Sequence, residues 1–344
     1  MKCYDIYIFI ICIFICSCSH NVSTETYLPP DFITTHTVEI VPLNESLLVD
    51  MPSKMWKVDS LLILGTRSAD NDAHFQILSA TNGTYMGNFG NIGRGNNELL
   101  DYARASINVA EKRLFATDVA GKCILIDLKD MLTNNIQQVQ SYTVSYGTDA
   151  QDVYCTNDKL LLLNGYPKRF CLTDMQCRDT LAYSNDYPII TQIDDDEYKK
   201  RVYYSTSSSF AVKPNGEQFC NFTRNGMLME IFTIKHNDIR LSKRRYFYKT
   251  KMKDLMKGDD DCIRGCSCVQ ATDKYIYALY YDTPINDKNA LPQLGIFDWS
   301  GNEICKYEFT EKVVNFCISS TDDKVYCWII NPLGEEYLGY FDLI

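Results

Sequence analysis

Short apolar runs with strand character recur along the chain at a nearly constant spacing. Six of them begin at residues 61, 114, 160, 218, 275 and 325, and they read LLILGTR, LFATDVA, LLLLNGY, QFCNFTR, YIYALYY and VYCWIIN. Their starts lie 46 to 58 residues apart, which is close to the length of one blade of a β-propeller. No window sustains apolar residues at helical spacing, so helices are not expected to build the fold.

Each run has companions that also have strand character. A strand ending in a polar turn, such as Asn215-Gly216, precedes it, and a third strand follows it; Asn, Asp and Gly accept the left-handed conformations of tight hairpins. A fourth strand follows in the first five sets, whereas the sixth set stops at Ile344 with three. The isolated strand pattern at Thr35–Leu43 supplies the missing one. We therefore predict an all-β, six-bladed β-propeller of four-stranded antiparallel blades, closed by an N-terminal strand that completes the last blade.

The N-terminal segment has the pattern of an export signal. Ile6–Ile15 is an apolar run too short for a membrane-spanning helix, which needs about 20 residues, but long enough for a secretory signal. It is followed by Cys16-Ser17-Cys18, which with Ile15 resembles a bacterial lipobox and implies a lipid anchor on Cys18, with the membrane as a partner. An ordinary cleaved signal, in which Cys18 has no role, is the alternative. The predicted organisation is a lipoprotein signal peptide over 1–17, a tether over 18–33 and the propeller over 34–344.

Two further segments resemble a known family. Gly87–Leu99, GNFGNIGRGNNEL, resembles the Gly-x-Gly-Pro-Gly-Glu loop of the TolB-like six-bladed propeller lipoproteins of Bacteroidota. Gly93, Gly95 and Glu98 match this loop, and Asn96-Asn97 replaces Pro-Gly. Leu114–Leu128 is similar to the core of an NHL-type repeat. The resemblance implies this fold and an outer-membrane lipoprotein of the cell envelope, but no particular activity. Because residues 19–24 lack the acidic surface-export signal of related lipoproteins, we expect the periplasmic side rather than the cell surface.

Composition restricts the function classes. Asp and Glu number 44 against 34 Lys and Arg, a net charge of −10, which disfavours nucleic acid as a partner. The chain has four His and no Gly-x-Ser-x-Gly, His-Glu-x-x-His or Walker motif, so no catalytic residue is assigned. The acidic clusters lack EF-hand spacing, and Cys262, Cys266 and Cys268 lack partner ligands, so neither a metal nor another cofactor is predicted. Most cysteines after Cys18 are interpreted as small apolar fillers of strands, Cys171 and Cys177 could bridge, and Cys262, Cys266 and Cys268 are structural thiols or form a local disulfide.

The connections between the predicted strands differ in length. In a four-stranded blade, the 1–2 and 3–4 connections lie at one end of the propeller, and the 2–3 and interblade connections lie at the other. The predicted long connections, over 67–73, 91–104, 185–205, 249–264 and 282–292, all belong to the second class. Long loops at one end of a rigid scaffold are a usual place for binding. The candidate binding face there consists of Asp70, Asp72, His74, Arg94, Glu98, Tyr187, Asp194, Asp195, Asp196, Tyr198, Arg201, Tyr203 and Tyr204.

Tyrosines beside mixed charges suit the recognition of polar ligands. The sequence therefore predicts a lipid-anchored extracytoplasmic binding or scaffold protein that recognises a glycan, a peptide or an envelope protein without a covalent step. The alternative is a propeller-type hydrolase or lyase that acts on glycans or peptides. Such an enzyme needs a His and a carboxylate, or two carboxylates, facing each other across the propeller axis. His74 and Asp194–Asp196 are the residues that can supply them.

Overall fold

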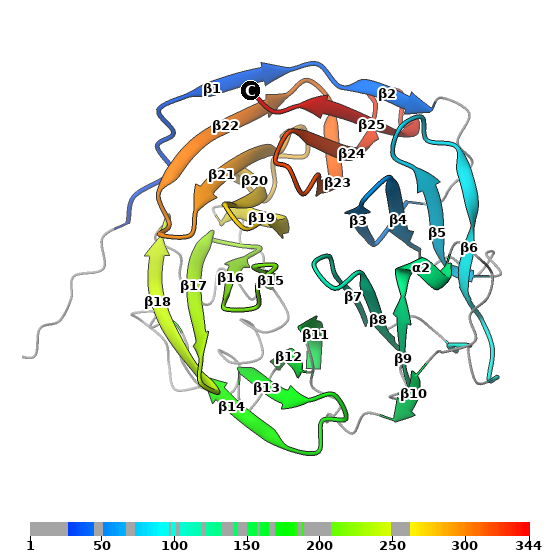
Figure 1. Cartoon of the computed structure of the whole chain (residues 1–344). Coiled ribbons are helices and arrows are strands. Elements are labelled where there is room, and N and C mark those ends of the chain that lie inside the picture. The colour runs from blue at the N-terminus through cyan, green and yellow to red at the C-terminus, as the bar shows by residue number, and fades with distance from the viewer. Residues whose placement is uncertain are drawn as a thin grey trace, which may run out of the picture.

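The six apolar runs form the second strands of six sheets that surround a central axis (Figure 1). The structure is a computed structural model, and it describes residues 27–44, 51–66, 73–95, 98–100, 104–118, 122–131, 140–143, 150–156, 159–164, 169–184, 188, 208–248 and 262–344. Within each sheet, consecutive strands pair antiparallel in chain order. The predicted six-bladed all-β propeller is confirmed.

Blades 1 to 3 each contain four consecutive strands, and the first strand of each blade is innermost (Figure 1). Blade 1 consists of β3 (Lys54–Val58), β4 (Leu61–Gly65), β5 (Ala73–Ser79) and β6 (Tyr85–Asn91). Blade 2 consists of β7 (Arg104–Asn108), β8 (Arg113–Thr117), β9 (Lys122–Asp127) and β10 (Gln140–Thr143). Blade 3 consists of β11 (Ala150–Thr156), β12 (Lys159–Asn164), β13 (Phe170–Asp174) and β14 (Thr180–Ser184).

Blades 4 to 6 complete the ring. Blade 4 consists of β15 (Ser208–Val212), β16 (Gln218–Thr223), β17 (Leu228–Lys235) and β18 (Asp238–Tyr246). Blade 5 consists of β19 (Ile263–Ala271), β20 (Tyr275–Pro284), β21 (Gln293–Asp298) and β22 (Glu303–Phe309), joined by β1 (Thr35–Val38). Blade 6 consists of β23 (Lys312–Ile318), β24 (Lys324–Ile330), β25 (Glu336–Asp342) and β2 (Val41–Asn44).

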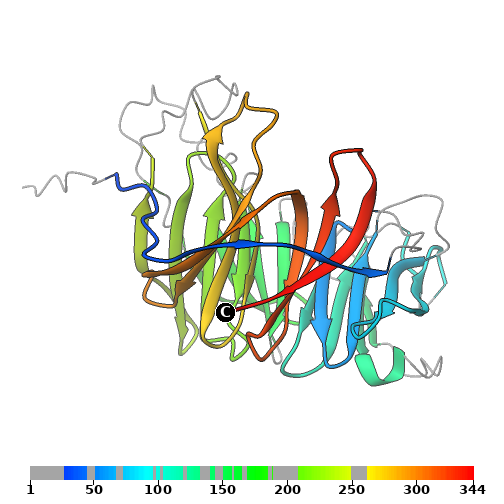
Figure 2. The ribbon, with the colours of Figure 1, turned by 90° about the horizontal axis from the view of Figure 1, so that it is seen from above.

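The N-terminal segment closes the ring, as predicted, but it does so across two blades. Strand β2 pairs antiparallel with β25, with Val41 opposite Tyr340, and so completes the last blade. The residues just before it form β1, which pairs parallel with β22 and places Thr35 opposite Lys306. Strand β2 is the fourth strand of blade 6, so it runs in the same direction around the rim as β22, the fourth strand of blade 5. The residues just before β2 continue in that direction, and β1 therefore lies parallel to β22. The segment therefore passes around the outer rim over blades 5 and 6 (Figure 2).

The hydrophobic core is divided among the blade interfaces. The buried apolar residues form six clusters, and each cluster joins two neighbouring blades. A middle strand of a blade therefore has both faces covered, and all five residues of β4 are buried. This explains why the second strands are continuous apolar runs rather than alternating patterns. Cys123, Cys155 and Cys220 are fully buried within these clusters, which agrees with their interpretation as small apolar fillers.

The turns follow the predicted chemistry, with one exception. Gly216 and Gly301 have positive φ values of 74° and 79° at the tips of hairpins in blades 4 and 5, where glycine meets no steric penalty. The exception is the 3–4 connection of blade 2, predicted to be short. It spans 128–139 and begins with the short helix α2 (Leu128–Met131).

Apart from 128–139, the longest connections between the observed strands lie at one end of the ring, which we call the wide end. The 2–3 and interblade connections lie there, and they include 92–103, 185–207, 247–262 and 285–292 between the observed strands. Figure 2 shows two of the 2–3 connections, those of blades 5 and 6, projecting on the same side. The predicted separation of long and short connections is thus confirmed apart from blade 2.

Candidate functional site

A cavity of about 470 Å³ lies on the propeller axis. Residues from the innermost strands of all six blades line it, namely β3, β7, β11, β15, β19 and β23. Its size and its position at the meeting point of all blades are typical of ligand pockets in proteins. This central channel is the candidate functional site.

An ion pair in the channel wall links blades 1 and 3. Lys54, at the start of β3, places its Nζ 2.7 Å from Oδ1 and 2.9 Å from Oδ2 of Asp152 on β11. The same Nζ donates to the carbonyl oxygen of Ala105 on β7 at 3.0 Å. One lysine therefore connects blades 1, 2 and 3. Both side chains of the pair keep about a quarter to a third of their surface exposed, 31% for Lys54 and 26% for Asp152, so the pair faces the channel.

A thiol lies on the opposite part of the wall. Cys268 on β19 lines the channel, and its Sγ donates to Oδ1 of Asn315 on β23 at 3.5 Å. Burial raises the pKa of the Cys268 thiol to about 11, although the positive charges of Lys54 and Arg224 act to lower it. The thiol is therefore protonated at neutral pH, which does not favour a nucleophilic role.

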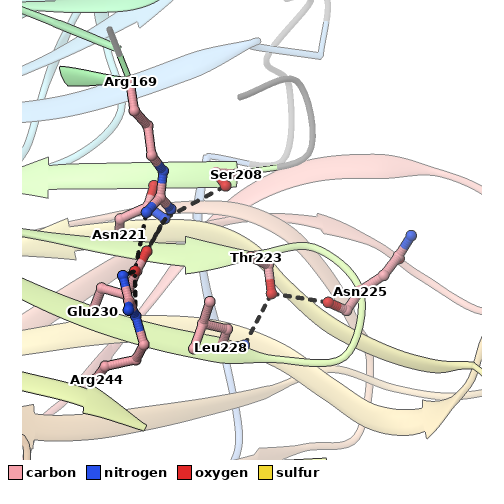
Figure 3. Close-up of polar contacts among 8 residues, drawn as sticks. All are labelled: Arg169, Ser208, Asn221, Thr223, Asn225, Leu228, Glu230 and Arg244. Atoms are coloured by element: carbon pink, nitrogen blue, oxygen red, sulfur yellow. Dashed lines mark hydrogen bonds and ion pairs between the residues drawn. The ribbon is translucent and has the colours of Figure 1, made fainter. Parts of the chain in front are cut away.

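Arg224 is the third charged residue of the described lining. It follows β16 at the wide end, and its side chain is exposed. Thr223 stabilises this turn, because its Oγ1 donates to the carbonyl oxygen of Asn225 at 2.8 Å and accepts from the backbone N–H of Leu228 at 2.9 Å (Figure 3). The backbone N–H of Gly265 on β19 donates to the carbonyl oxygen of Arg224 at 2.7 Å. Hydrogen bonds within blade 4 and from blade 5 thus hold the backbone of Arg224.

A buried polar network leads from the channel wall into the interface between blades 3 and 4 (Figure 3). Ser208 lines the channel and accepts a hydrogen bond of 3.5 Å from Nδ2 of Asn221, which also donates to Glu230 at 3.2 Å. Arg169, from the blade 3 side, makes two contacts with the Glu230 carboxylate, one of them at 3.0 Å. Arg244 on β18 adds a contact of 2.8 Å. Because the charges are paired inside the protein, this network has a structural role.

Ten residues of the predicted binding face lie outside the described residues. They are Asp70, Asp72, Tyr187, Asp194, Asp195, Asp196, Tyr198, Arg201, Tyr203 and Tyr204. Cys18 and the whole predicted signal peptide also lie outside them. The three remaining members, His74, Arg94 and Glu98, are described, and they differ in their surroundings.

Glu98 and the neighbouring glycines form a compact loop. The backbone N–H of Gly95 donates to Oε2 of Glu98 at 2.7 Å, and the N–H of Gly93 donates to the carbonyl oxygen of Leu99 at 3.1 Å. A Cβ at Gly93 would overlap the carboxylate end of the Glu98 side chain, so a larger residue there would require Glu98 to move. This geometry explains the Gly-x-Gly and Glu pattern as a loop-closing device. Arg94, between the two glycines, is exposed.

His74 is a buried residue of β5. It is 4% exposed, and its Nε2 lies 3.1 Å from the carbonyl oxygen of Leu99. The side chain therefore helps to fix the loop that follows blade 1, and it is not among the residues that line the channel. The predicted alternative of a hydrolase or lyase pairs His74 with Asp194–Asp196, which lie outside the described residues.

The described cysteines are all free thiols, including Cys171 and Cys177, so these two do not form the bridge that their hairpin position allowed. Within the part of the chain that the structure describes, no group of three or more His, Cys, Asp or Glu residues has the arrangement of a metal site. The described helices also include none long and apolar enough to cross a membrane.

Comparison with known families agrees with the observed fold. The family described as TolB-like 6-blade propeller-like matches residues 31–321, most of the described ring. The chain belongs to this family. Membership of the TolB-like family confirms the resemblance noted at Gly87–Leu99 as far as the propeller is concerned. No curated protein matches the sequence.

Solved structures are similar to this TolB-like chain in fold only, because their sequence identities are low. A Bacteroides fragilis NCTC 9343 protein, predicted to be exported, has a TM-score of 0.55 and 11% identity, covering 90% of this chain and 98% of that one. A member of the duf4221 family from Bacteroides vulgatus ATCC 8482 has a TM-score of 0.59 and 8% identity, covering 88% and 94%. The Cps50 (Swd1) β-propeller domain of Myceliophteria thermophila has a TM-score of 0.52 and 11% identity, covering 89% and 100%.

Sequence reasoning did not identify the charged residues of the channel. Lys54, Asp152 and Arg224 come from three different blades, and each lies in a strand or directly after one. Their position in the blades was the signal that could have identified them. Lys54 and Asp152 lie near the start of a first strand, and Arg224 follows the end of a second strand. All three positions adjoin the wide end. The length of the connections instead predicted a binding face on the long loops.

Proposed function

We propose that this TolB-like chain is an exported, lipid-anchored binding protein whose ligand enters the central channel from the wide end. The observation that carries the proposal is the cavity of about 470 Å³, to which every innermost strand contributes. Such a pocket is formed by the rigid part of the fold and needs no rearrangement before binding. The ligand is a peptide or a glycan of the cell envelope, and binding involves no covalent step.

Two observations support the location in the envelope. Ile6–Ile15 followed by Cys18 has the pattern of a lipoprotein signal, and the similar Bacteroides fragilis protein is itself predicted to be exported. Anchoring through acyl chains, each contributing about 0.8 kcal/mol per buried CH₂, retains a protein at a membrane without a spanning helix. We place the protein on the periplasmic side of the outer membrane.

The anchor is tested by replacing Cys18. In cells grown with labelled palmitate, Cys18→Ala should lose the label and leave the membrane fraction, because the thiol is the acylation site. Cys16→Ser is the matched control; this variant should keep the label and stay in the membrane fraction. Retention of label in the Cys18→Ala protein would contradict the lipid anchor and leave an ordinary signal as the interpretation.

The channel is tested by blocking it. Ser267 on β19 lines the channel and is exposed, so Ser267→Trp should fill the cavity with little disturbance of the blade. A screen of envelope glycans and peptides against the soluble chain from Ser19, read by calorimetry, should find ligands whose binding this variant reduces at least tenfold. Ser300→Trp, at an exposed turn of the same blade at the other end, is the matched control. Equal binding by both variants would place the ligand elsewhere.

A further inference from the structure

Positive charge is concentrated on one strand of the outer rim. The whole chain carries a net charge of −10, but β18 carries four cations and one anion, namely Arg240, Lys243, Arg244, Arg245 and Asp238. Among the other outer strands that the structure describes, β1, β2, β6, β10 and β14 carry no Lys, Arg, Asp or Glu, and β22 has two Glu and one Lys. The rim of blade 4 is therefore a basic part of an acidic molecule.

Three cations of this rim are exposed to solvent. Lys243 on β18 and Lys235 at the end of β17 are both exposed, and neither has an ion-pair partner among the described residues. Arg240 is 82% exposed, and its Nε lies 2.5 Å from Oδ2 of Asp238, so these two charges compensate each other. The positive charge left over belongs to the two lysines. We call Lys235, Arg240 and Lys243 the basic rim.

A β-bulge places the basic rim on one face of the β17–β18 hairpin. Arg240 lies opposite Thr233, and Lys243 lies opposite Ile231. Residues two apart in a strand point to the same face, so Ile231, Thr233 and Lys235 share one face of β17. The register shift between the two pairs gives β18 one extra residue, which places Lys243 on the same face as Arg240. The three cations therefore act on the same side of the blade.

The N-terminal segment joins the ring beside the basic rim (Figure 2). The backbone N–H of Leu28 donates to the carbonyl oxygen of Tyr246 at 3.3 Å, and a guanidinium nitrogen of Arg245 donates to the carbonyl oxygen of Leu28 at 3.5 Å. Phe32 is buried between blades 4 and 5, whereas Leu28 is 55% exposed and Ile33 is 95% exposed. Exposed apolar side chains thus lie at the same part of the rim as the exposed cations, a combination typical of surfaces that bind membranes.

The length of chain before this point limits its distance from a lipid anchor. Tyr27 pairs with Tyr246 of blade 4 and follows Cys18 by nine positions. Nine residues span about 30 Å at most, even when fully extended. Attraction between exposed charges acts over about 8 to 10 Å at physiological salt. A lipid on Cys18 would therefore hold blade 4 where its charges can reach the headgroups.

We propose that the basic rim, together with Leu28 and Ile33, docks on an anionic lipid surface, so that the outer rim of blade 4 faces the membrane. This inference rests on the proposed function, because the lipid anchor brings this rim to the membrane. Cations beside an anchor add electrostatic attraction to the binding by acyl chains. Because the contact is made through the rim, both ends of the channel stay uncovered, and the ligand can enter from the wide end.

The test measures cosedimentation of the soluble chain from Ser19, which has no anchor, with lipid vesicles. The chain should bind vesicles of phosphatidylglycerol mixed with phosphatidylcholine but not vesicles of phosphatidylcholine alone, and added salt should weaken the binding. The double variant Lys235→Gln with Lys243→Gln should bind about tenfold or more weakly, since each cation near an anionic surface contributes about fivefold. The matched control, Lys129→Gln with Lys312→Gln, removes the same charge from exposed lysines of blades 2 and 6 and should bind like the unaltered chain.

The outcomes separate this inference from the proposed function. No binding to the anionic vesicles, or equal losses in the two double variants, would overturn the docking surface. Binding to dextran sulfate but to no vesicle would assign the basic rim to a soluble polyanion and would also overturn it. The anchor is judged separately by palmitate labelling: a chain that is labelled at Cys18 but does not bind vesicles without its lipid keeps the anchor and loses the docking surface.

Discussion

The interfaces on the two sides of blade 4 are built differently. Between blades 3 and 4, the guanidinium of Arg169 and the carboxylate of Glu230 are both fully buried, with side-chain exposures of 0%. Between blades 4 and 5, Phe32 from the N-terminal segment packs against Tyr280 and Phe297, with ring centroids 6.4 and 5.3 Å apart. The first interface thus contains an internal ion pair, and the second contains an aromatic side chain inserted from outside the ring.

The two interfaces differ in how their contacts contribute to stability. A buried ion pair gains little net stability, because both charges must leave water, but breaking it leaves a charge without compensation. An apolar side chain stabilises by burial and depends less on direction. Phe32 fits because Gly295 lies beneath it; a Cβ there would lie 2.8 Å from its ring. The ion network joins consecutive blades, whereas Phe32 attaches the N-terminal segment before it closes the ring.

The largest effect is expected from breaking the ion pair. Arg169→Met should lower the free energy of unfolding by about 3 to 5 kcal/mol, because Glu230 then keeps its charge in a buried place with one arginine fewer. Urea denaturation measures this change. The double variant Arg169→Met with Glu230→Leu should recover most of the loss, since no buried carboxylate remains. A double variant as unstable as Arg169→Met would show that lost packing, rather than the charge, causes the effect.

A smaller loss is expected from the aromatic interface. Phe32→Ala should cost about 2 to 3 kcal/mol, at or below the lower end of the range for buried phenylalanine, because the ring lies at the rim and is 9% exposed. Ile33→Ala is the matched control: this neighbouring side chain is 95% exposed and should change stability by less than about 0.5 kcal/mol. Urea denaturation of both variants checks the prediction. Equal losses would mean that the segment contributes through its backbone pairing alone.

The smallest effect is expected from mild acid. Burial alone would raise the pKa of Glu230, but the charges and hydrogen bonds of Arg169 and Arg244 hold it below its ordinary value. A lowered folded pKa means that this stabilisation is complete above the ordinary pKa of about 4.3 and is lost as pH falls through the folded value. From pH 7 to pH 3, the wild type should therefore lose more unfolding free energy than Glu230→Gln. Parallel losses in urea denaturation would contradict this.

Much of the fold could be predicted because its signals are local. The runs that begin at Leu61 and Leu160 are apolar on both faces, and this pattern already indicates a strand between two covered surfaces. The Asn215-Gly216 turn and the loop closed by Gly93 and Glu98 likewise depend on residues close together in sequence. The division of Thr35–Leu43 into two strands on different blades was not predicted, because it depends on which strand of each blade lies at the rim.

The candidate site was less predictable because its residues are far apart in the sequence. Lys54 and Asp152 are 98 positions apart, and Arg224 belongs to a third blade. No local pattern connects them. His74 was selected as a rare residue type, but its burial against the carbonyl of Leu99 became visible only in the folded loop. The sequence alone determined the number of blades, the strands within them and the class of the long connections, because these depend on alternation and turn chemistry within a few residues. Only the tertiary structure decided which charges meet on the axis, because closing the ring places the start of every blade around one point.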